Sequence, residues 1–417
     1  MDPVRRLLLI AFGVLVLAAP GTADASSYIR YGVQDDAWLS YGPGTLESRL
    51  QRLDDLGVDV VRVTIDWREV EPTRDADKWA RYDELLDGLH EHGIAPLVTL
   101  YGTPRWANGG RSENWAPTSK WTFAAFARAA ATRYRFVRMW TIWNEPNQRR
   151  WLRPTSPRVY TETLLNVAYA SIHHVSPYSQ VAGGVTAPRA STGGVSPLAW
   201  IAGMKAAHAK LDAYAHNPYP LAPGETPSSG GCGHCTTITM ATLPRLLSSV
   251  QQAFGNRVRI WLTEYGYQTN PPDGLLGVSY ATQARYLAQA AQRAYAAPRV
   301  DVLIQYLVRD EPDPARWQSG LFTVRGIPKP SYDAFRFPLL ELARRGAAVT
   351  LWGQVRPGGR SNYRLQVFHA GAWHAVGRTF ATSTRGYFTR RLIAAPGAKV
   401  RIWSLESEAY SPALRLT

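Results

Sequence analysis

The sequence predicts an α/β fold, a (β/α)8 TIM barrel followed by a small antiparallel β-sandwich. Eight strand-like runs alternate strictly with eight helical segments over about 320 residues, which fits a closed barrel or a doubly wound open sheet. The count of eight and the lack of an early glycine-rich phosphate loop favour the barrel. After about Arg344 the helical period ends, and short alternating segments separated by glycine and proline predict the sandwich.

The chain begins with a segment typical of a secretory signal peptide. Arg5 and Arg6 precede an apolar run over 7–19, and Ala23-Asp24-Ala25 has the small-x-small pattern of a cleavage site. We therefore expect residues 1–25 to be removed and the mature protein to be secreted; an uncleaved N-terminal anchor is the alternative. No later stretch approaches the roughly 20 apolar residues of a transmembrane helix, so no membrane span is expected after cleavage.

Residues 26–344 carry the predicted barrel. Its strands are short runs rich in β-branched and aromatic residues, and its helices are longer runs with apolar residues at helical spacing. The strand candidates are 28–36, 58–67, 94–104, 138–147, 180–188, 211–220, 259–268 and 300–310. The helix candidates are 45–56, 82–92, 119–134, 157–175, 197–210, 243–254, 281–297 and 332–344. In such barrels the chemistry lies at the carboxyl ends of the strands.

Residues 345–417 form the predicted sandwich, and they are strongly basic. They contain eleven basic and two acidic residues, so they hold +9 of the chain's net charge of +15. This surplus predicts binding to an anionic polysaccharide or another cell-envelope polymer. A solvated arginine-rich surface, or a domain docked on the barrel as a structural lid, is the alternative. Nucleic acid is not expected as a partner, because the chain is predicted to be exported.

Two of the barrel strands end in glutamates surrounded by aromatic residues. The fourth closes with Trp140-Thr141-Ile142-Trp143-Asn144-Glu145-Pro146-Asn147, and the seventh with Ile260-Trp261-Leu262-Thr263-Glu264-Tyr265-Gly266. Strands four and seven lie across the mouth of a barrel from each other, so Glu145 and Glu264 can approach. A pair of carboxyl groups about 5–5.5 Å apart is what a retaining glycosidase needs, one as nucleophile and one as general acid/base.

The Trp-Asn-Glu-Pro-Asn run resembles the signature of glycoside hydrolase clan A, and Thr-Glu-Tyr-Gly is similar to the nucleophile segment of that clan. The resemblance covers roughly residues 28–340 and includes families 5 and 39. It implies a retaining glycosidase on a (β/α)8 barrel, with Glu145 as acid/base, Glu264 as nucleophile, and no metal or other cofactor. Asn144 would then bind the sugar 2-hydroxyl, in a contact that strengthens in the transition state.

The same resemblance assigns further substrate-binding residues. Arg62 corresponds to the arginine that faces the nucleophile and keeps it ionised, although a salt bridge inside the barrel is the structural alternative. On strand six we take His216 and Tyr219 as the residues near Glu264. Their spacing departs from the His-x-Tyr of family 5, and a hydrogen-bonded core histidine is an equally simple reading of His216.

Aromatic residues at the ends of strands three and eight are candidate walls of the sugar subsites. Tyr306 stands where many relatives place a tryptophan platform, which leaves that subsite open. Tyr101 and Trp106 lie in a segment similar to family 39 members. For each of these rings, packing in the core is the alternative.

The chain has two cysteines, Cys232 and Cys235, in a Gly/Ser/Pro-rich loop after strand six. In an exported chain we expect them to form a local disulfide that holds the loop at 221–236 over the barrel rim. A redox site needs a strand–helix–strand context that this loop lacks, and zinc needs more ligands than these cysteines and His234 supply.

The sequence therefore predicts a secreted retaining glycosidase that cleaves β-linked oligo- or polysaccharides. A transglycosylase on the same scaffold and a catalytically inert sugar-binding barrel are the alternatives. The inert barrel is disfavoured because both glutamates are present at the expected strand ends. A redox protein built around the two cysteines is a third, weaker reading.

Overall fold

A computed structural model describes residues 28–417, so the predicted signal peptide at 1–25 lies outside the described residues. The described chain divides into two units, one ending at Arg336 and the other running from Phe337 to Thr417. Each unit has its own core, and each is described by itself.

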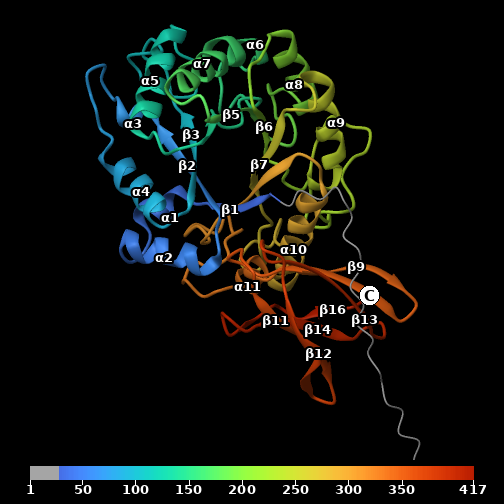
Figure 1. Cartoon of the computed structure of the whole chain (residues 1–417). Helices are drawn as coiled ribbons and strands as arrows, with labels where there is room; N and C mark the ends of the chain where they lie inside the picture. Colours follow the sequence, from blue (N-terminus) through green and yellow to red (C-terminus); the bar gives the residue numbers. More distant parts are fainter. Residues whose placement is uncertain (1–27) are drawn as a thin grey trace, which may run out of the picture. The chain divides into compact units, whose positions relative to one another are not determined.

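The first unit is a closed barrel of eight parallel strands in sequence order, which confirms the predicted fold class (Figure 1). The strands are β1 (Arg30–Gln34), β2 (Val60–Asp66), β3 (Ala95–Tyr101), β4 (Met139–Ile142), β5 (Gln180–Thr186), β6 (Ala213–His216), β7 (Arg259–Tyr265) and β8 (Val300–Tyr306). The barrel closes where β1 pairs with β8 over five residues, from Arg30 opposite Val302 to Gln34 opposite Tyr306.

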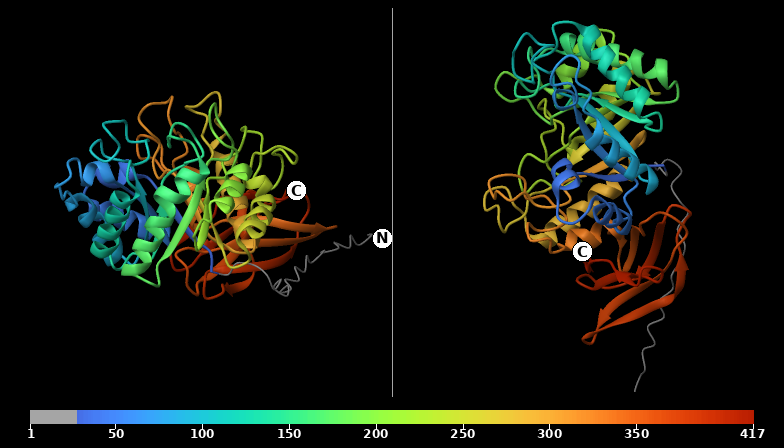
Figure 2. Two further views of the ribbon diagram at one scale, coloured as in Figure 1. Left: turned by 90° about the horizontal axis from the view of Figure 1, so that it is seen from above. Right: turned by 90° about the vertical axis from the view of Figure 1, so that its left-hand side faces the viewer.

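Helices surround the barrel strands as an outer layer (Figures 1 and 2). The longer ones are α2 (Leu46–Leu56), α4 (Ala80–Glu91), α5 (Lys120–Arg133), α7 (Asn166–Val175), α8 (Pro197–Ala206), α9 (Leu243–Phe254) and α10 (Tyr280–Ala296). The shorter ones are α1 (Asp36–Tyr41), α3 (Trp67–Val70), α6 (Pro157–Val159), η1 (Tyr160–Leu165), η2 (Met240–Thr242) and α11 (Pro330–Arg336).

Helix α2 shows why these segments are helical. The side chain of Thr45 caps its first turn by accepting from the backbone N–H of Ser48, and Gly57 ends it with a left-handed φ of 69°. The leucines between these caps lie on one buried face, as their spacing predicts. The barrel strands, by contrast, are buried on both faces, and Leu97 and Trp261 belong to the cluster that fills the interior.

The predicted helix over 332–344 is wrong in its second half. Helix α11 ends at Arg336, and β9 (Leu339–Arg345) follows as the first strand of the second unit. Pro338 separates the two elements, and proline inside a helix removes a backbone donor and clashes with the preceding turn. The alternation of residues after this proline is therefore that of a strand.

The second unit consists of two antiparallel sheets, as predicted (Figure 2). One sheet has the order β13-β10-β9, and the other has the order β12-β11-β14-β15 with β16 also paired to β14. The remaining strands are β10 (Ala348–Gln354), β11 (Asn362–His369), β12 (Ala372–Ala381), β13 (Tyr387–Ile393), β14 (Lys399–Ser404), β15 (Ala409–Tyr410) and β16 (Leu414–Arg415). Buried side chains from both sheets form one core, which includes Leu351, Leu365 and Ile402.

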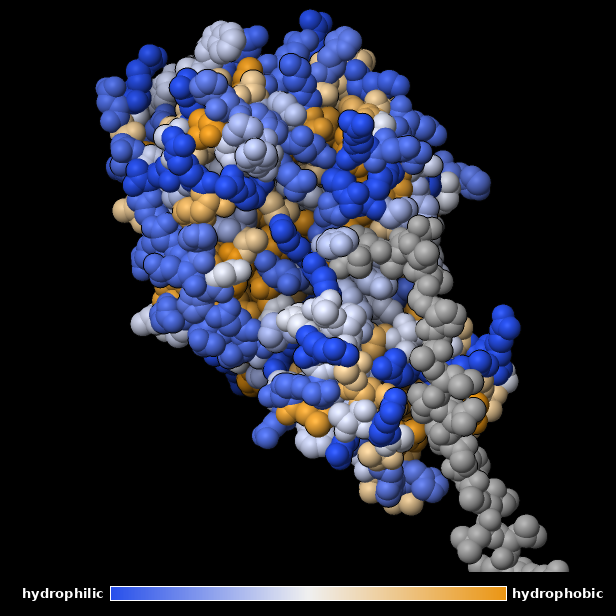
Figure 3. Space-filling view, in the orientation of Figure 1, coloured by the Kyte–Doolittle hydropathy of each residue, from blue (hydrophilic) through white to orange (hydrophobic). Residues whose placement is uncertain are grey.

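Hydrophilic side chains cover most of the face seen in Figure 3, with hydrophobic ones in small patches between them. Within residues 28–417, no helix is both long enough and apolar enough to cross a membrane.

Candidate active site

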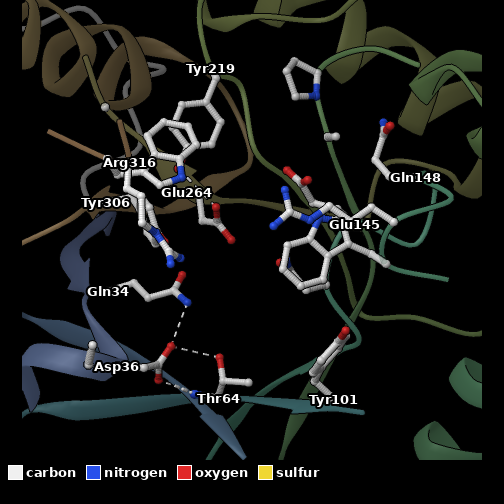
Figure 4. Close-up of a pocket in the computed structure, with 18 of the residues that line it drawn as sticks. Gln34, Asp36, Thr64, Tyr101, Glu145, Gln148, Tyr219, Glu264, Tyr306 and Arg316 are labelled. Carbon is white, nitrogen blue, oxygen red and sulfur yellow. Dashed lines mark hydrogen bonds between the residues drawn. The ribbon is translucent and has the colours of Figure 1, made fainter. Parts of the chain in front are cut away.

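A cavity of about 830 Å3 opens at the carboxyl ends of the barrel strands, and both predicted glutamates line it (Figure 4). The side chains around it come from the carboxyl ends of the eight barrel strands or from the segments that follow them. Figure 4 shows the carboxyl groups of Glu145 and Glu264 on opposite walls, both directed into the cavity. This is the edge of the barrel where the sequence predicts the chemistry.

Glu264, near the end of β7, is held by a cation and a hydroxyl. Its Oε1 accepts a hydrogen bond from Nη1 of Arg62 at 2.5 Å, and its Oε2 accepts one from the hydroxyl of Tyr219 at 3.1 Å. Arg62 is completely buried, whereas the Glu264 side chain is 11% exposed. Glu264 is thus paired with a buried cation, and it lines the cavity.

Arg62, on β2, is fixed by hydrogen bonds to four further groups. Nε donates to Oγ1 of Thr99 at 2.9 Å, and Nη1 donates to Oε1 of Gln34 at 2.8 Å. Nη1 also reaches the carbonyl of Thr263 at 3.3 Å, and Nη2 donates to Oδ1 of Asn144 at 3.0 Å. A charge buried this deeply is tolerated because its donors are paired. The two alternatives predicted for Arg62, a salt bridge inside the barrel and a contact with Glu264, are one and the same ion pair.

Glu145 lies in the turn after β4, where the backbone is unusual. Trp143 and Glu145 have positive φ values of 73° and 39°, a region that side-chain-bearing residues rarely adopt. The indole of Trp143 is fully buried, and its Nε1 donates to the carbonyl of Trp151 at 2.7 Å, which anchors the turn. This anchored turn directs the Glu145 side chain into the cavity.

Glu145 forms no ion pair among the described residues, and its hydrogen-bond partners are neutral groups. Its Oε1 accepts a hydrogen bond from Nδ2 of Asn217 at 3.1 Å. Burial, and then the nearby charge of Glu264, raise the pKa of Glu145 from 4.5 to about 7; the Asn217 hydrogen bond and the charge of Arg62 act in the opposite direction. Glu145 therefore keeps its proton up to near-neutral pH.

Asn144 and Tyr219 lie where the sequence predicts them. The Oδ1 of Asn144 faces Arg62, so its Nδ2 is left to donate to a ligand in the cavity that it lines. Burial and the adjacent charge of Glu264 raise the pKa of Tyr219 well above its ordinary value, so it remains a hydrogen-bond donor. Tyr219 also packs against Trp317, with ring centroids 5.0 Å apart, and Trp317 packs edge-on against Tyr306. These three rings line one wall.

Of the other two aromatic candidates, Tyr101 lines the cavity and Trp106 does not. Tyr101 lines the cavity and packs against Trp143 and Trp151, with centroids 4.9 and 5.7 Å away. Trp106 is not among the cavity residues. Its Nε1 donates to the carbonyl of Glu71, and its ring packs edge-on against Trp67 at 5.6 Å. The prediction that Trp106 lines a subsite is therefore not supported, and the packing alternative describes its surroundings.

His216 also lies outside the cavity. It is the last residue of β6, fully buried, with Nδ1 at 2.8 Å from Oγ1 of Thr186 and Nε2 at 3.0 Å from the carbonyl of Ile238. Burial lowers the pKa of this histidine to about 4, so it is neutral. With both ring nitrogens occupied, His216 cannot contact Glu264, and it matches the alternative of a hydrogen-bonded core histidine.

The predicted disulfide between Cys232 and Cys235 is not present in the structure. Cys232 and Cys235 are free thiols in the structure. The backbone N–H of Cys235 donates to Sγ of Cys232 at 3.0 Å, and Arg245 donates to the carbonyl of Cys232 at 3.0 Å. The loop is held instead by Glu225, whose Oε2 accepts from the backbone N–H of Leu221 at 2.8 Å. Leu221 and the residues that follow it line the cavity, so the loop contributes to its wall without a cross-link.

Two parts of the site are missing from the sequence-based prediction. One is Asn217, which follows His216 and donates to Glu145. A second group lies on the wall formed by β1 and β2 (Figure 4). There the carboxylate of Asp36 accepts from the backbone N–H of Thr64 at 2.8 Å, from its hydroxyl at 3.1 Å and from Nε2 of Gln34 at 3.1 Å.

This group connects to Glu264, because Gln34 also accepts from Arg62, which is paired with Glu264. A chain of hydrogen bonds thus runs from Glu264 through Arg62 and Gln34 to Asp36, whose carboxylate lines the cavity. No sequence motif marks Asp36. Among the described residues, no cluster of three or more His, Cys, Asp or Glu side chains could hold a metal ion.

Comparison with known proteins supports the resemblance seen in the motifs. The family model for glycosyl hydrolase family 1 matches residues 35–176, a range that includes Arg62 and Glu145. No curated protein matches the sequence. Many solved structures match the fold, and several of them are glycosidases.

One match is a family 39 glycoside hydrolase from the gut symbiont Bacteroides cellulosilyticus WH2, with a TM-score of 0.62 and 18% identity, covering 88% of this chain and 81% of that one. Another is a monomeric β-xylosidase from Caulobacter crescentus CB15, with a TM-score of 0.59 and 16% identity, covering 89% and 95%. A glucosidase from Croceicoccus marinus matches with a TM-score of 0.61 and 13% identity, covering 93% and 98%.

The chain has the fold of the clan A glycosidases. The predicted resemblance to this clan is therefore confirmed. The family model and the structural matches name different families, 1 and 39, so their agreement is at the level of the clan. Within this fold, Glu145 lies in the turn that follows the fourth strand, and Glu264 lies near the end of the seventh.

Proposed function

We propose that this protein is a retaining glycosidase that hydrolyses β-linked glycosides. The observation that carries the proposal is the unequal surroundings of two carboxyl groups on one cavity. Glu264 is paired with Arg62, whereas Glu145 has a pKa raised to about 7. A nucleophile must be ionised and a general acid must be protonated at the same pH, and these surroundings favour that division.

In the first step, an oxygen of Glu264 attacks the anomeric carbon while Glu145 gives its proton to the glycosidic oxygen. The bond between that carbon and the glycosidic oxygen breaks, and the leaving group departs as an alcohol. The sugar stays on Glu264 as an ester. Asn144, with Oδ1 fixed by Arg62, offers its Nδ2 to the sugar 2-hydroxyl, and Tyr219 holds the other oxygen of Glu264.

In the second step, the ionised Glu145 takes a proton from water, and the water oxygen attacks the anomeric carbon. The bond to Glu264 breaks, so the nucleophile returns as a carboxylate and Glu145 returns to its acid form. The two inversions leave the anomeric configuration unchanged. An alcohol in place of water would give transglycosylation from the same intermediate, so the two outcomes differ only in the acceptor.

The test is a Glu264→Ala variant assayed on an aryl β-glycoside. We expect the rate to fall by roughly 10⁴-fold or more, since the nucleophile is lost. Added azide should restore turnover and yield a glycosyl azide of inverted configuration. Glu47→Gln, a substitution on the exposed surface of α2, should leave the rate unchanged. Full activity of Glu264→Ala would overturn the assignment, and no hydrolysis of any β-glycoside by the wild type would favour the inert sugar-binding barrel.

Secretion is part of the same proposal. It rests on the positively charged start, the apolar run and the small-residue site within residues 1–25. We expect the N-terminus of the mature protein, determined after expression in a secreting host, to be Ser26. A product that keeps Met1 and stays with the membrane would support the uncleaved anchor instead.

A further inference from the structure

One sheet of the second unit has a face composed of rings and cations. In antiparallel pairs, residues directly opposite each other lie on the same face of the sheet, and so do residues two apart on one strand. Phe368 of β11 lies opposite Trp373 of β12, Gln366 opposite Arg401 of β14, and Arg364 opposite Trp403. Trp403 in turn lies opposite Tyr410 of β15. Together with Lys399, two residues before Arg401, these side chains define the ring–cation face.

The other face of this sheet is the core. Tyr363 and Leu365 of β11 and Val400 and Ile402 of β14 alternate with residues of the ring–cation face, and all four are buried in the sandwich core. The ring–cation face is exposed by comparison: Phe368 retains 39% and Tyr410 41% of its accessible surface. Because the core already occupies one face, the rings on the other side are not needed to fill it.

The cations on this face are stacked on its rings. The guanidinium of Arg401 lies over the ring of Trp373 at 4.3 Å and over that of Tyr410 at 3.8 Å. Arg364 lies over Trp403 at 5.7 Å. A hydrogen bond from Nε of Arg401 to Oε1 of Gln366, at 2.8 Å, further fixes its plane. Such stacking holds a guanidinium in one orientation, which lowers the entropy it loses on binding a ligand.

These cations lack a carboxylate partner within residues 28–417. Neither Arg364, Lys399 nor Arg401 takes part in a salt bridge there. The second unit contains three acidic side chains, all elsewhere: Glu341 on β9, and Glu406 and Glu408 in the turn between β14 and β15. The ring–cation face therefore has positive charge that is not neutralised locally, arranged on a rigid sheet.

We propose that the ring–cation face binds an anionic polysaccharide. The guanidinium groups provide planar pairs of N–H donors that match a carboxylate or sulfate group. The half-exposed rings beside them provide flat apolar surfaces for the C–H faces of pyranose rings. A neutral glucan would leave three cations unused, and a small anion would leave the rings unused. An anionic sugar polymer uses both.

The choice of a sugar polymer over a nucleic acid rests on the proposed glycosidase function of the barrel. The function of this face is separate from catalysis: it would keep the enzyme on its polymer between cleavage events. Linking a polymer-binding surface to a catalytic site raises the effective concentration of substrate without changing the chemical step.

The test measures binding of the full chain to matched pairs of polymers. Polygalacturonate is compared with its fully methyl-esterified form, and dextran sulfate with dextran, by affinity electrophoresis at two salt concentrations. We expect the wild type to bind the charged member of at least one pair at least tenfold more tightly, and this difference to shrink at high salt. The double variant Arg364→Gln/Arg401→Gln should lose at least tenfold of that affinity.

Controls separate this face from general charge and from misfolding. Arg345→Gln/Arg391→Gln removes the same charge from exposed positions of the other sheet and should bind nearly as the wild type does. Lys399→Gln, at an exposed position, should weaken binding severalfold without altering thermal unfolding, and Trp373→Ala should weaken binding even at high salt. All variants should hydrolyse a small aryl glycoside at the wild-type rate.

Three results would overturn the proposal. One is equal affinity for the charged and neutral polymers. Another is an equal loss in the control double variant. The third is tighter binding to a single-stranded oligonucleotide or to anionic lipid vesicles than to either charged polysaccharide. Because binding is measured without catalysis, an inactive barrel would leave this test unaffected.

Discussion

Two glutamates on opposite walls of the cavity, Glu264 and Glu145, have different surroundings. On the β7 wall, Glu264 has a guanidinium at 2.5 Å and a tyrosine hydroxyl at 3.1 Å. On the β4 wall, Glu145 is half-buried, accepts from the amide of Asn217 at 3.1 Å and hydrogen-bonds to the side chain of Trp151, and its pKa rises to about 7. Because the residue type is identical, the different surroundings alone distinguish the two carboxyl groups.

The partners themselves are arranged as two small networks. Arg62 connects Glu264 to Asn144 and to Gln34, so these three side chains share one cation. Asn217 connects Glu145 to Thr263 on β7, through a hydrogen bond of 2.8 Å from the threonine hydroxyl. The charged network therefore surrounds Glu264, and the network of neutral hydrogen-bond partners surrounds Glu145. Each prediction below changes one member of one network.

The largest effect is expected for Glu145→Ala, which removes the proton donor from the neutral network. General acid catalysis typically contributes about 10²–10⁴-fold, so cleavage of an alkyl glycoside should fall by that factor. A 2,4-dinitrophenyl glycoside should form the glycosyl-enzyme at nearly the wild-type rate, because its leaving group needs no proton. The measurement is kcat/KM for both substrates. An equal loss on both would mean that Glu145 does not act as the acid.

The same contrast shows what a sequence can reveal. The two glutamates were predictable because each lies at or shortly after the carboxyl end of a buried parallel strand. Arg62, the third residue of β2, was predictable only through the resemblance to clan A. The strands are apolar runs, and in the fourth and seventh runs a glutamate stands at or just after the end. The barrel itself was predictable for the same reason, since eight alternations leave few topologies.

The sequence could not predict which face of a strand each side chain occupies. On β6, His216 turns into the barrel wall to bind Thr186 and Ile238, so it is Asn217 that reaches Glu145. A shift of one residue exchanges the two faces of a strand, and the spacing pattern does not fix that phase. Asp36 depends on the approach of Thr64, 28 residues away, which the pairing of β1 with β2 brings about. The positive charge of the second unit was visible in the sequence, but the strand register was needed to place Arg364, Lys399 and Arg401 on one face of a sheet.

The next effect in size is expected for Asp36→Asn, which removes a charge from the wall that carries the Arg62 network. A hydrogen bond to a charged group contributes about 1.5–3 kcal/mol, so kcat/KM should fall by roughly 10- to 100-fold. The loss should be smaller for at least one deoxy analogue of the glycone, namely the one lacking the hydroxyl that Asp36 binds. Ser40→Ala, at a nearby cavity position, serves as the control. A uniform loss across all deoxy analogues would assign Asp36 a structural role.

The smallest effect is expected for Asn217→Ala, and it concerns pH. Glu145 must be protonated to act as the acid, so activity should fall as the pH rises through its pKa of about 7. The Asn217 hydrogen bond lowers that pKa because the amide donor stabilises the ionised form; its removal should therefore move the alkaline limb of the kcat/KM profile to higher pH. Thr263→Val, which removes only the group that orients Asn217, should shift the limb in the same direction by less. A limb that stays in place or moves to lower pH in both variants would show that the neutral network does not set the proton affinity of Glu145.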